Sequence, residues 1–302
     1  MTMPARPGNC PIVATPFTAD GAVDHESLES ELRFIADAGC EAATFFGIAS
    51  EFYKLSDAEK DRLVEVATDA CAALGLSPVI SVTHDATVVA VDRARQYEAA
   101  GADCVMVFPP YFMGPGAEGV LEHVRAIGEA VSVPVMVQHT SLNADIDPET
   151  WADLHREVPN VRYFKIEVDP PGPYISELLE ATDGEVTVLV GNAGWQLVDA
   201  YDRGAEGVMP AAVYEELYCE IDRRYREGDR AGARDLHDRL LGALNDFSGT
   251  DSSKHLLAER GIIATPHCRE PTSGIGDEVR ERLLMESHER VMGIVAELGA
   301  VR

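Results

Sequence analysis

The sequence predicts an α/β protein, a (β/α)8 TIM barrel with a C-terminal helical extension. Short apolar runs alternate with longer segments of helical period, and eight such units fit within the first 210 residues. The apolar runs are continuous, which is typical of parallel strands covered on both faces, because a strand with one face in water alternates polar and apolar residues. A turn signature between helix and strand also recurs. Together these features match the usual size and organisation of a barrel.

The predicted strands begin near the N-terminus and end before residue 210. We expect them at residues 12–16, 42–46, 78–82, 104–108, 134–138, 161–165, 187–190 and 207–209. Helix-start signals agree with this spacing. Ser56 and Glu59 form a capping box, and Asp147 supplies an N-cap before Pro148 at the first helical position.

The recurring turn places a glycine between a predicted helix and the next strand, at Gly39, Gly101 and Gly204. Such a glycine can adopt the left-handed conformation that ends a helix. We expect residues 1–212 to form the barrel core and residues 213–302 to form the last barrel helix and a C-terminal helical region of the same structural unit. An open doubly wound sheet is the alternative, disfavoured because no Gly-x-Gly-x-x-Gly loop follows the first strand.

Composition excludes several classes of partner. The chain carries 52 acidic and 25 basic residues, a net charge of −27, whereas nucleic-acid binding depends on clustered Lys and Arg. Six scattered cysteines without a Cys-x-x-Cys pair indicate reduced core thiols. No apolar run approaches the ~20 residues of a membrane span, and no apolar leader is evident. We therefore expect no nucleic-acid or membrane partner and a cytoplasmic location.

Lys165 is the most informative residue for function. It is one of four lysines and ends the apolar run at residues 161–165. An amine in an apolar pocket loses the solvation that favours its charged form, so its pKa falls and it can form a Schiff base with a carbonyl compound. A lysine that reaches water from a strand end is the alternative. Its place on the predicted sixth strand, where barrel active sites are built, favours the functional interpretation.

Four segments, at residues 11–17, 47–52, 164–167 and 204–208, resemble the dihydrodipicolinate synthase and N-acetylneuraminate lyase family of class I aldolases. They read PIVATPF, GIASEF, FKIE and GAEGV, and the resemblance extends to about residue 257. It implies a TIM barrel with C-terminal helices and a homo-oligomer, a dimer or a tetramer built from dimers. It also implies a Schiff base between the strand-six lysine and a small-molecule 2-oxo acid, most often pyruvate. Lys165 matches that lysine.

The sequence departs from the family pattern at the residues that handle protons. The family loop after strand two reads GTTGE, whereas Ile48 and Ala49 replace the threonines here, leaving backbone N–H groups and the Ser50 hydroxyl as candidate carboxylate donors. The strand-five tyrosine of the family aligns with Gln138, which cannot act as an acid or base near neutral pH. A second family tyrosine aligns with Phe112.

Other groups must therefore transfer protons, and Tyr111, Ser50 and His139 are the nearest in sequence. Because neighbouring strand residues face opposite sides, His139 should point away from the cavity if Gln138 points inward. We expect Gln138 to hydrogen-bond a polar substrate group and Glu51 to hold its loop in shape. Transfer through bound water or the substrate carboxylate is a further possibility.

The predicted site combines catalytic and binding residues. The catalytic candidates are Lys165, Gln138 and Tyr111. The substrate-binding candidates are Ile48, Ala49, Ser50, Gln138, Gly191, Asn192 and Met209. Asn192 is equally explained as a residue that satisfies its own turn.

We expect neither a cofactor nor a metal. The rim residues considered as metal ligands show no His-x-His or His-Glu-x-x-His spacing, and they are His84, Asp85, His139, Glu51 and Glu167.

The function expected from the sequence is a Schiff-base lyase or aldolase that makes or breaks a carbon–carbon bond of a 2-oxo acid. Three alternatives stay open: a 2-oxo acid hydratase or dehydratase using the same imine, dihydrodipicolinate synthase itself, and a non-catalytic 2-oxo acid binding protein.

Overall fold

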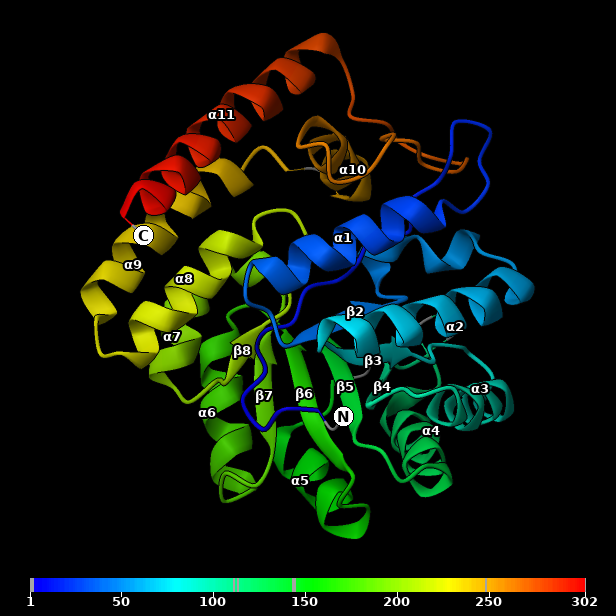
Figure 1. Cartoon of the computed structure of the whole chain (residues 1–302). Helices are drawn as coiled ribbons and strands as arrows, with labels where there is room; N and C mark the ends of the chain where they lie inside the picture. The colour runs from blue at the N-terminus through cyan, green and yellow to red at the C-terminus, as the bar shows by residue number, and fades with distance from the viewer. Residues whose placement is uncertain (1–2, 111, 113, 143–144, 248, 302) are drawn as a thin grey trace.

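The computed structural model describes residues 3–110, 112, 114–142, 145–247 and 249–301. Eight parallel strands form one sheet in the order β1-β8-β7-β6-β5-β4-β3-β2, surrounded by helices (Figure 1). The strands are β1 (Gly8–Asn9), β2 (Ala42–Phe45), β3 (Ser77–Ser81), β4 (Cys104–Val107), β5 (Val135–Thr140), β6 (Val161–Glu167), β7 (Thr187–Val190) and β8 (Gly207–Val208). Ile12 bridges to Thr44 of β2 and to Ala211 beyond β8, which closes the sheet into a barrel. The predicted (β/α)8 barrel is confirmed.

Helices follow the strands and continue into the C-terminal region. The barrel helices are α1 (His25–Asp37), α2 (Asp57–Leu74), α3 (Thr87–Ala99), α4 (Gly116–Ala130), α5 (Pro148–Glu157), α6 (Pro171–Ala181), α7 (Leu197–Asp202) and α8 (Glu215–Arg226). The C-terminal helices are α9 (Arg230–Leu244), α10 (Gly249–Glu259) and α11 (Glu278–Val301). Short 3₁₀ turns are η1 (Ile48–Ser50), η2 (Phe52–Lys54) and η3 (Asn192–Gly194). Among the described helices, none is both long and apolar enough to cross a membrane.

The first strand was predicted in the wrong place. β1 lies at Gly8–Asn9, and the predicted strand at residues 12–16 makes only the isolated bridges at Ile12. Pro11 and Pro16 lack an N–H group, so this segment cannot donate a continuous ladder of hydrogen bonds. The segment nevertheless links both edges of the barrel, because Ile12 N donates to Pro210 O and Val13 N donates to Thr44 O.

Strand alternation determines which side chains face the barrel interior. Met136 of β5 and Tyr163 of β6 belong to a small apolar cluster inside the barrel, whereas Phe164 and Ile166 pack with the helices. Residues two apart on a strand share a face. The residues that follow Tyr163 at this spacing are Lys165 and Glu167, so β6 directs both toward the mouth of the barrel.

Substitution of Gly207 by alanine tests the close approach of β1 to β8. Gly207 pairs with Gly8, and a methyl group at position 207 would overlap the Gly8 carbonyl oxygen. We expect Gly207→Ala to lower the free energy of unfolding by about 1–3 kcal/mol, measured by chemical denaturation. Gly242→Ala in α9 is the matched control, because beyond its own neighbours and the backbone of its helix no described atom lies within 4 Å of the added methyl. Equal stability of the two variants would contradict this account of barrel closure.

Candidate active site

A cavity of about 490 Å³ opens at the carboxyl-terminal end of the strands. This volume lies within the range of small-molecule sites. Of the predicted site residues, the cavity is lined by Lys165, Gln138, Ile48, Ala49, Asn192 and Met209. The C-terminal region also contributes, through Leu244, Phe247, Gly249, Thr250 and Ser253. Tyr111 lies outside the described residues, so its predicted role stays a prediction.

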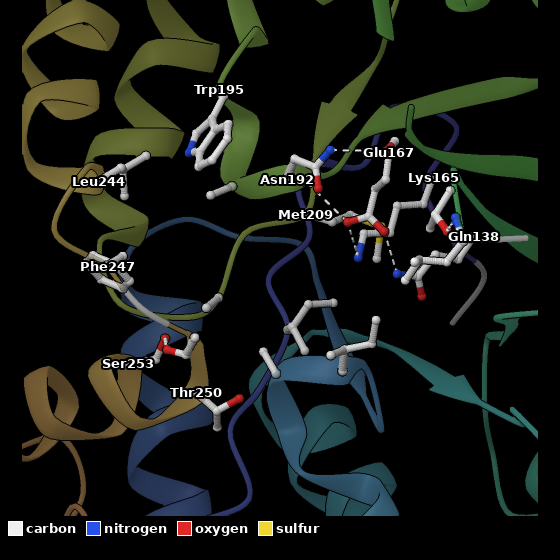
Figure 2. Close-up of a pocket in the computed structure, with 18 of the residues that line it drawn as sticks. Gln138, Lys165, Glu167, Asn192, Trp195, Met209, Leu244, Phe247, Thr250 and Ser253 are labelled. Atoms are coloured by element: carbon white, nitrogen blue, oxygen red, sulfur yellow. Dashed lines mark hydrogen bonds and ion pairs between the residues drawn. The ribbon is translucent and has the colours of Figure 1, made fainter. Parts of the chain in front are cut away.

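Lys165 points into this cavity from β6 and is 5% exposed (Figure 2). Its Nζ lies 3.1 Å from Oε1 of Glu167, which is also largely buried. Strand pairing places Gln138 opposite Lys165 and Thr140 opposite Glu167. The end of β6 therefore presents an amine and a carboxylate side by side within the barrel mouth.

Glu167 is the centre of the polar network. Gln138 Nε2 donates to Oε2 at 2.5 Å, and the Asn192 backbone N–H donates to Oε1 at 3.1 Å (Figure 2). Burial acts to raise the pKa of Glu167, but attraction to Lys165 and the hydrogen bonds from Gln138 and Asn192 outweigh it and hold the pKa below its ordinary value. Glu167 is therefore ionised at neutral pH.

The central position of Glu167 was not predicted. The sequence identified it only as a rim residue and a candidate metal ligand. The signal was the spacing Lys-x-Glu, because two residues separated by one position on a strand face the same side.

Gly191 and Ser50 are not among the residues that line the cavity, and their predicted part in substrate binding stays a prediction. A methyl group at Gly191 would overlap the side chain of Glu167, so this glycine leaves room for the carboxylate. The Ser50 hydroxyl donates to the Val13 carbonyl oxygen at 2.7 Å, and the Ser50 carbonyl accepts a hydrogen bond from Thr15. Ser50 thus fastens η1 to the first segment of the chain, and its hydroxyl is turned away from the site.

Glu51 holds the loop after β2 in a strained conformation. Its φ of 54° lies in the left-handed region, which is uncommon for a residue other than glycine. The carboxylate forms ion pairs with Lys54 and with the fully buried Lys254 of α10, and it accepts a hydrogen bond from the backbone N–H of Arg269. These contacts offset the strain and join the loop to the C-terminal region, as expected for a loop-holding residue.

His139 points away from the cavity, as predicted from its position beside Gln138. Its ring stacks on Tyr174 with the centroids 4.7 Å apart and meets the edge of Trp151. Burial lowers the pKa of His139 to about 4. The imidazole is therefore neutral at physiological pH and belongs to the packing between β5 and the helices.

Three of the five rim residues considered as metal ligands contact other side chains. His139 faces the helices, Glu51 is paired with two lysines, and Glu167 is paired with Lys165. Across the residues that the structure describes, no three His, Cys, Asp or Glu side chains are grouped so that they could hold a metal ion.

Comparison with known proteins gives the family. The model of the dihydrodipicolinate synthetase family matches residues 7–287. The chain belongs to the dihydrodipicolinate synthetase family.

Relatives in this family cover nearly the whole chain. An L-2-keto-3-deoxyarabonate dehydratase of Azospirillum brasilense is 29% identical over 298 residues, which is 93% of both chains. A 4-hydroxy-tetrahydrodipicolinate synthase of Persephonella marina is 31% identical and covers 98% of this chain and 99% of its own. The crystal structure of dihydrodipicolinate synthase from Rhodopseudomonas palustris superposes with a TM-score of 0.86 at 25% identity, covering 96% of this chain and 99% of that one. Membership in the dihydrodipicolinate synthetase family supports the conclusion that the chain is an enzyme.

A His139→Phe variant tests the structural interpretation of this histidine. The ordinary pKa of 6.5 falls to about 4 in the folded chain, so the unfolded chain binds a proton that the folded chain does not as the pH drops from 6.5 toward 4. The free energy of unfolding of the wild-type protein should therefore fall on acidification, and His139 should account for about 2 kcal/mol of the loss between pH 7 and pH 5. Phenylalanine keeps the stacking and removes this contribution, which urea unfolding at the two pH values would measure. An identical loss of stability in both proteins would contradict the interpretation.

Proposed function

We propose that the chain is a class I lyase or aldolase that forms a Schiff base between Lys165 and a 2-oxo acid. The observation that carries this proposal is the pairing of a buried amine with a buried carboxylate, 3.1 Å apart, in the barrel mouth. Lys165 also occupies the position that matches the strand-six lysine of the family. A Schiff base supplies the electron sink that carbon–carbon cleavage of a 2-oxo acid requires.

Imine formation begins with removal of a proton from the Lys165 ammonium, because only the free amine is nucleophilic. Glu167 Oε1 is positioned to accept that proton directly. The amine lone pair then adds to C2 of the substrate and forms the new carbon–nitrogen bond. The former carbonyl oxygen takes one proton from the new ammonium nitrogen and one from the protonated Glu167, and it leaves as water. A positively charged iminium is left on Lys165, and Glu167 is ionised again.

The next step is proton transfer at C3, which the iminium makes acidic. We assign the base to Glu167, which is ionised again once water has left and whose pKa is held below the ordinary value. Transfer of a C3 proton to this carboxylate gives an enamine. In the synthetic direction the enamine carbon forms a bond to an aldehyde, whose oxygen takes the proton back from Glu167, and water then hydrolyses the product iminium and frees Lys165. In the cleavage direction the same groups act in reverse. Gln138 serves as a positioning residue, since its amide N–H holds Oε2 of Glu167.

The substrate carboxylate requires donors that the replaced threonines no longer provide. Within the described residues, the backbone N–H groups of Ile48 and Ala49 have no hydrogen-bond acceptor, and both residues line the cavity. The first N–H groups of a helical turn have no partner inside the turn. We assign carboxylate binding to these two groups in place of the Ser50 hydroxyl.

A dehydratase using the same imine is the second candidate. The relative from Azospirillum brasilense is a dehydratase and is aligned over 93% of both chains. Transfer of a C3 proton to Glu167 would also start elimination of a C4 hydroxyl as water. The products separate the two reactions, because a lyase releases an aldehyde together with a 2-oxo acid and a dehydratase releases water.

Reductive trapping tests the Schiff base. Treatment with borohydride in the presence of pyruvate should place a stable carboxyethyl group on the peptide that contains Lys165, as detected by mass spectrometry. Lys165→Arg should abolish this adduct because arginine presents no primary amine. Lys60→Arg, at a lysine outside the cavity, is the matched control and should leave the adduct unchanged. Modification elsewhere, with Lys165 unmodified, would refute the proposed chemistry.

A further inference from the structure

The cavity has two chemically different ends. Gln138, Lys165 and Glu167 lie together on one side, and Trp195, Leu244 and Phe247 lie on the opposite side (Figure 2). We refer to Trp195, Leu244 and Phe247 as the apolar end. Trp195 is 60% exposed, although it is a large apolar side chain. Large apolar groups left open in a cavity indicate a surface that another molecule covers.

The apolar end offers no charge to a ligand. Lys165 and Glu167 are the only charged side chains that line the cavity within the described part of the chain, and they pair with each other at the opposite end. The uncharged hydroxyls of Thr250 and Ser253 lie at its border, and Ser253 already donates to the Gly249 carbonyl at 3.4 Å. A second carboxylate or a phosphate would lose its hydration here without gaining a cation.

Trp195 is held in place by the turn that precedes it. Asn192, Ala193 and Gly194 all have positive φ angles, which makes η3 a tight turn. The Tyr218 hydroxyl donates to the Ala193 carbonyl at 2.7 Å, and His237 Nε2 donates to the Gly194 carbonyl at 2.8 Å. The indole is therefore presented to the cavity by a fixed backbone, as expected of a binding surface formed before the ligand arrives.

We propose that the apolar end binds an uncharged aromatic or branched aliphatic substituent, carried beyond C3 of the 2-oxo acid. This inference rests on the proposed function, which places the 2-oxo acid unit at Lys165. A substituent beyond C3 extends into the remainder of the same cavity. Its contact with Trp195 and Phe247 removes apolar surface from water and permits ring packing. A polyhydroxylated chain would instead leave hydroxyl groups without partners against these side chains.

Comparison of different 2-oxo acids in the trapping reaction tests the substrate class. The concentration that gives half-maximal borohydride trapping on Lys165 should be at least about tenfold lower for 2-oxo-4-phenylbutanoate than for 2-oxoglutarate. Trp195→Ala should raise the value for the phenyl acid about tenfold and leave the value for pyruvate unchanged. Trp195→Leu should restore most of the preference, because leucine keeps apolar bulk. Val88→Ala removes an exposed apolar side chain outside the cavity and is the control.

Tryptophan fluorescence provides a readout that does not depend on the amine. The chain has two tryptophans, and Trp151 is completely buried, so a change in emission on ligand binding reports Trp195. Binding of 4-phenylbutanoate, which has no oxo group, should move the emission to shorter wavelength, whereas glutarate should not. The shift should persist in Lys165→Arg.

The possible outcomes separate this inference from the proposed function. Trapping of all 2-oxo acids with equal efficiency, without a fluorescence shift, would overturn the apolar end and leave the Schiff base intact. A shift without any trapping on Lys165 would overturn the Schiff base and support the apolar end. An equal rise in the half-maximal trapping concentration of 2-oxo-4-phenylbutanoate, 2-oxoglutarate and pyruvate in Trp195→Ala would also contradict the inference. Such a result would indicate general damage to the site.

Discussion

The ion pair between Lys165 and Glu167 is the interaction on which the site depends. Removing an ammonium and a carboxylate from water costs several kcal/mol per ion unless the two are paired and hydrogen-bonded. Gln138 from β5 and the backbone N–H of Asn192 in η3 complete the bonding of the carboxylate. These groups come from three neighbouring segments, so the pair is stable only when the strands are in register. The closed barrel supplies that register, and Gly191 supplies the space.

The C-terminal region is part of the site as well as of the scaffold. Lys254 of α10 is fully buried against Glu51, which joins α10 to the loop that carries Ile48 and Ala49. The same region brings Phe247 to the cavity wall. The buried pair of Lys165 and Glu167 thus positions the amine. The buried pair of Lys254 and Glu51 positions the loop after β2 and the part of the cavity wall formed by the C-terminal region. The two pairs together produce a cavity that is charged at one end and apolar at the other.

The sequence predicted the features that depend on local pattern. Continuous apolar strands and helix-start signals were sufficient for the barrel, and position on the sixth strand was sufficient to place Lys165 in the barrel mouth. Alternation along β5 also predicted the direction of His139. The first strand was misplaced because its apolar residues suggested a ladder that Pro11 and Pro16 interrupt.

Features set by distant contacts could not be predicted in the same way. The direction of the Ser50 hydroxyl depends on a bond to the Val13 carbonyl. The Lys-x-Glu spacing indicates the side of the strand on which Glu167 lies, but the hydrogen bonds that Gln138 and Asn192 donate to it come from other segments. The apolar end brings Trp195 together with Leu244 and Phe247, which are far from it in the chain. Neither local periodicity nor motif spacing predicts these contacts between distant segments.

Hydrogen–deuterium exchange at the methyl group of pyruvate in D2O tests the central claim most directly, because it requires both the imine and the transfer of a C3 proton. The wild-type protein should catalyse exchange, followed by NMR. Glu167→Gln should still form the borohydride-trapped adduct on Lys165 but exchange at least about a hundredfold more slowly. Exchange at the wild-type rate in Glu167→Gln would contradict the assignment of Glu167 as the base that works with Lys165.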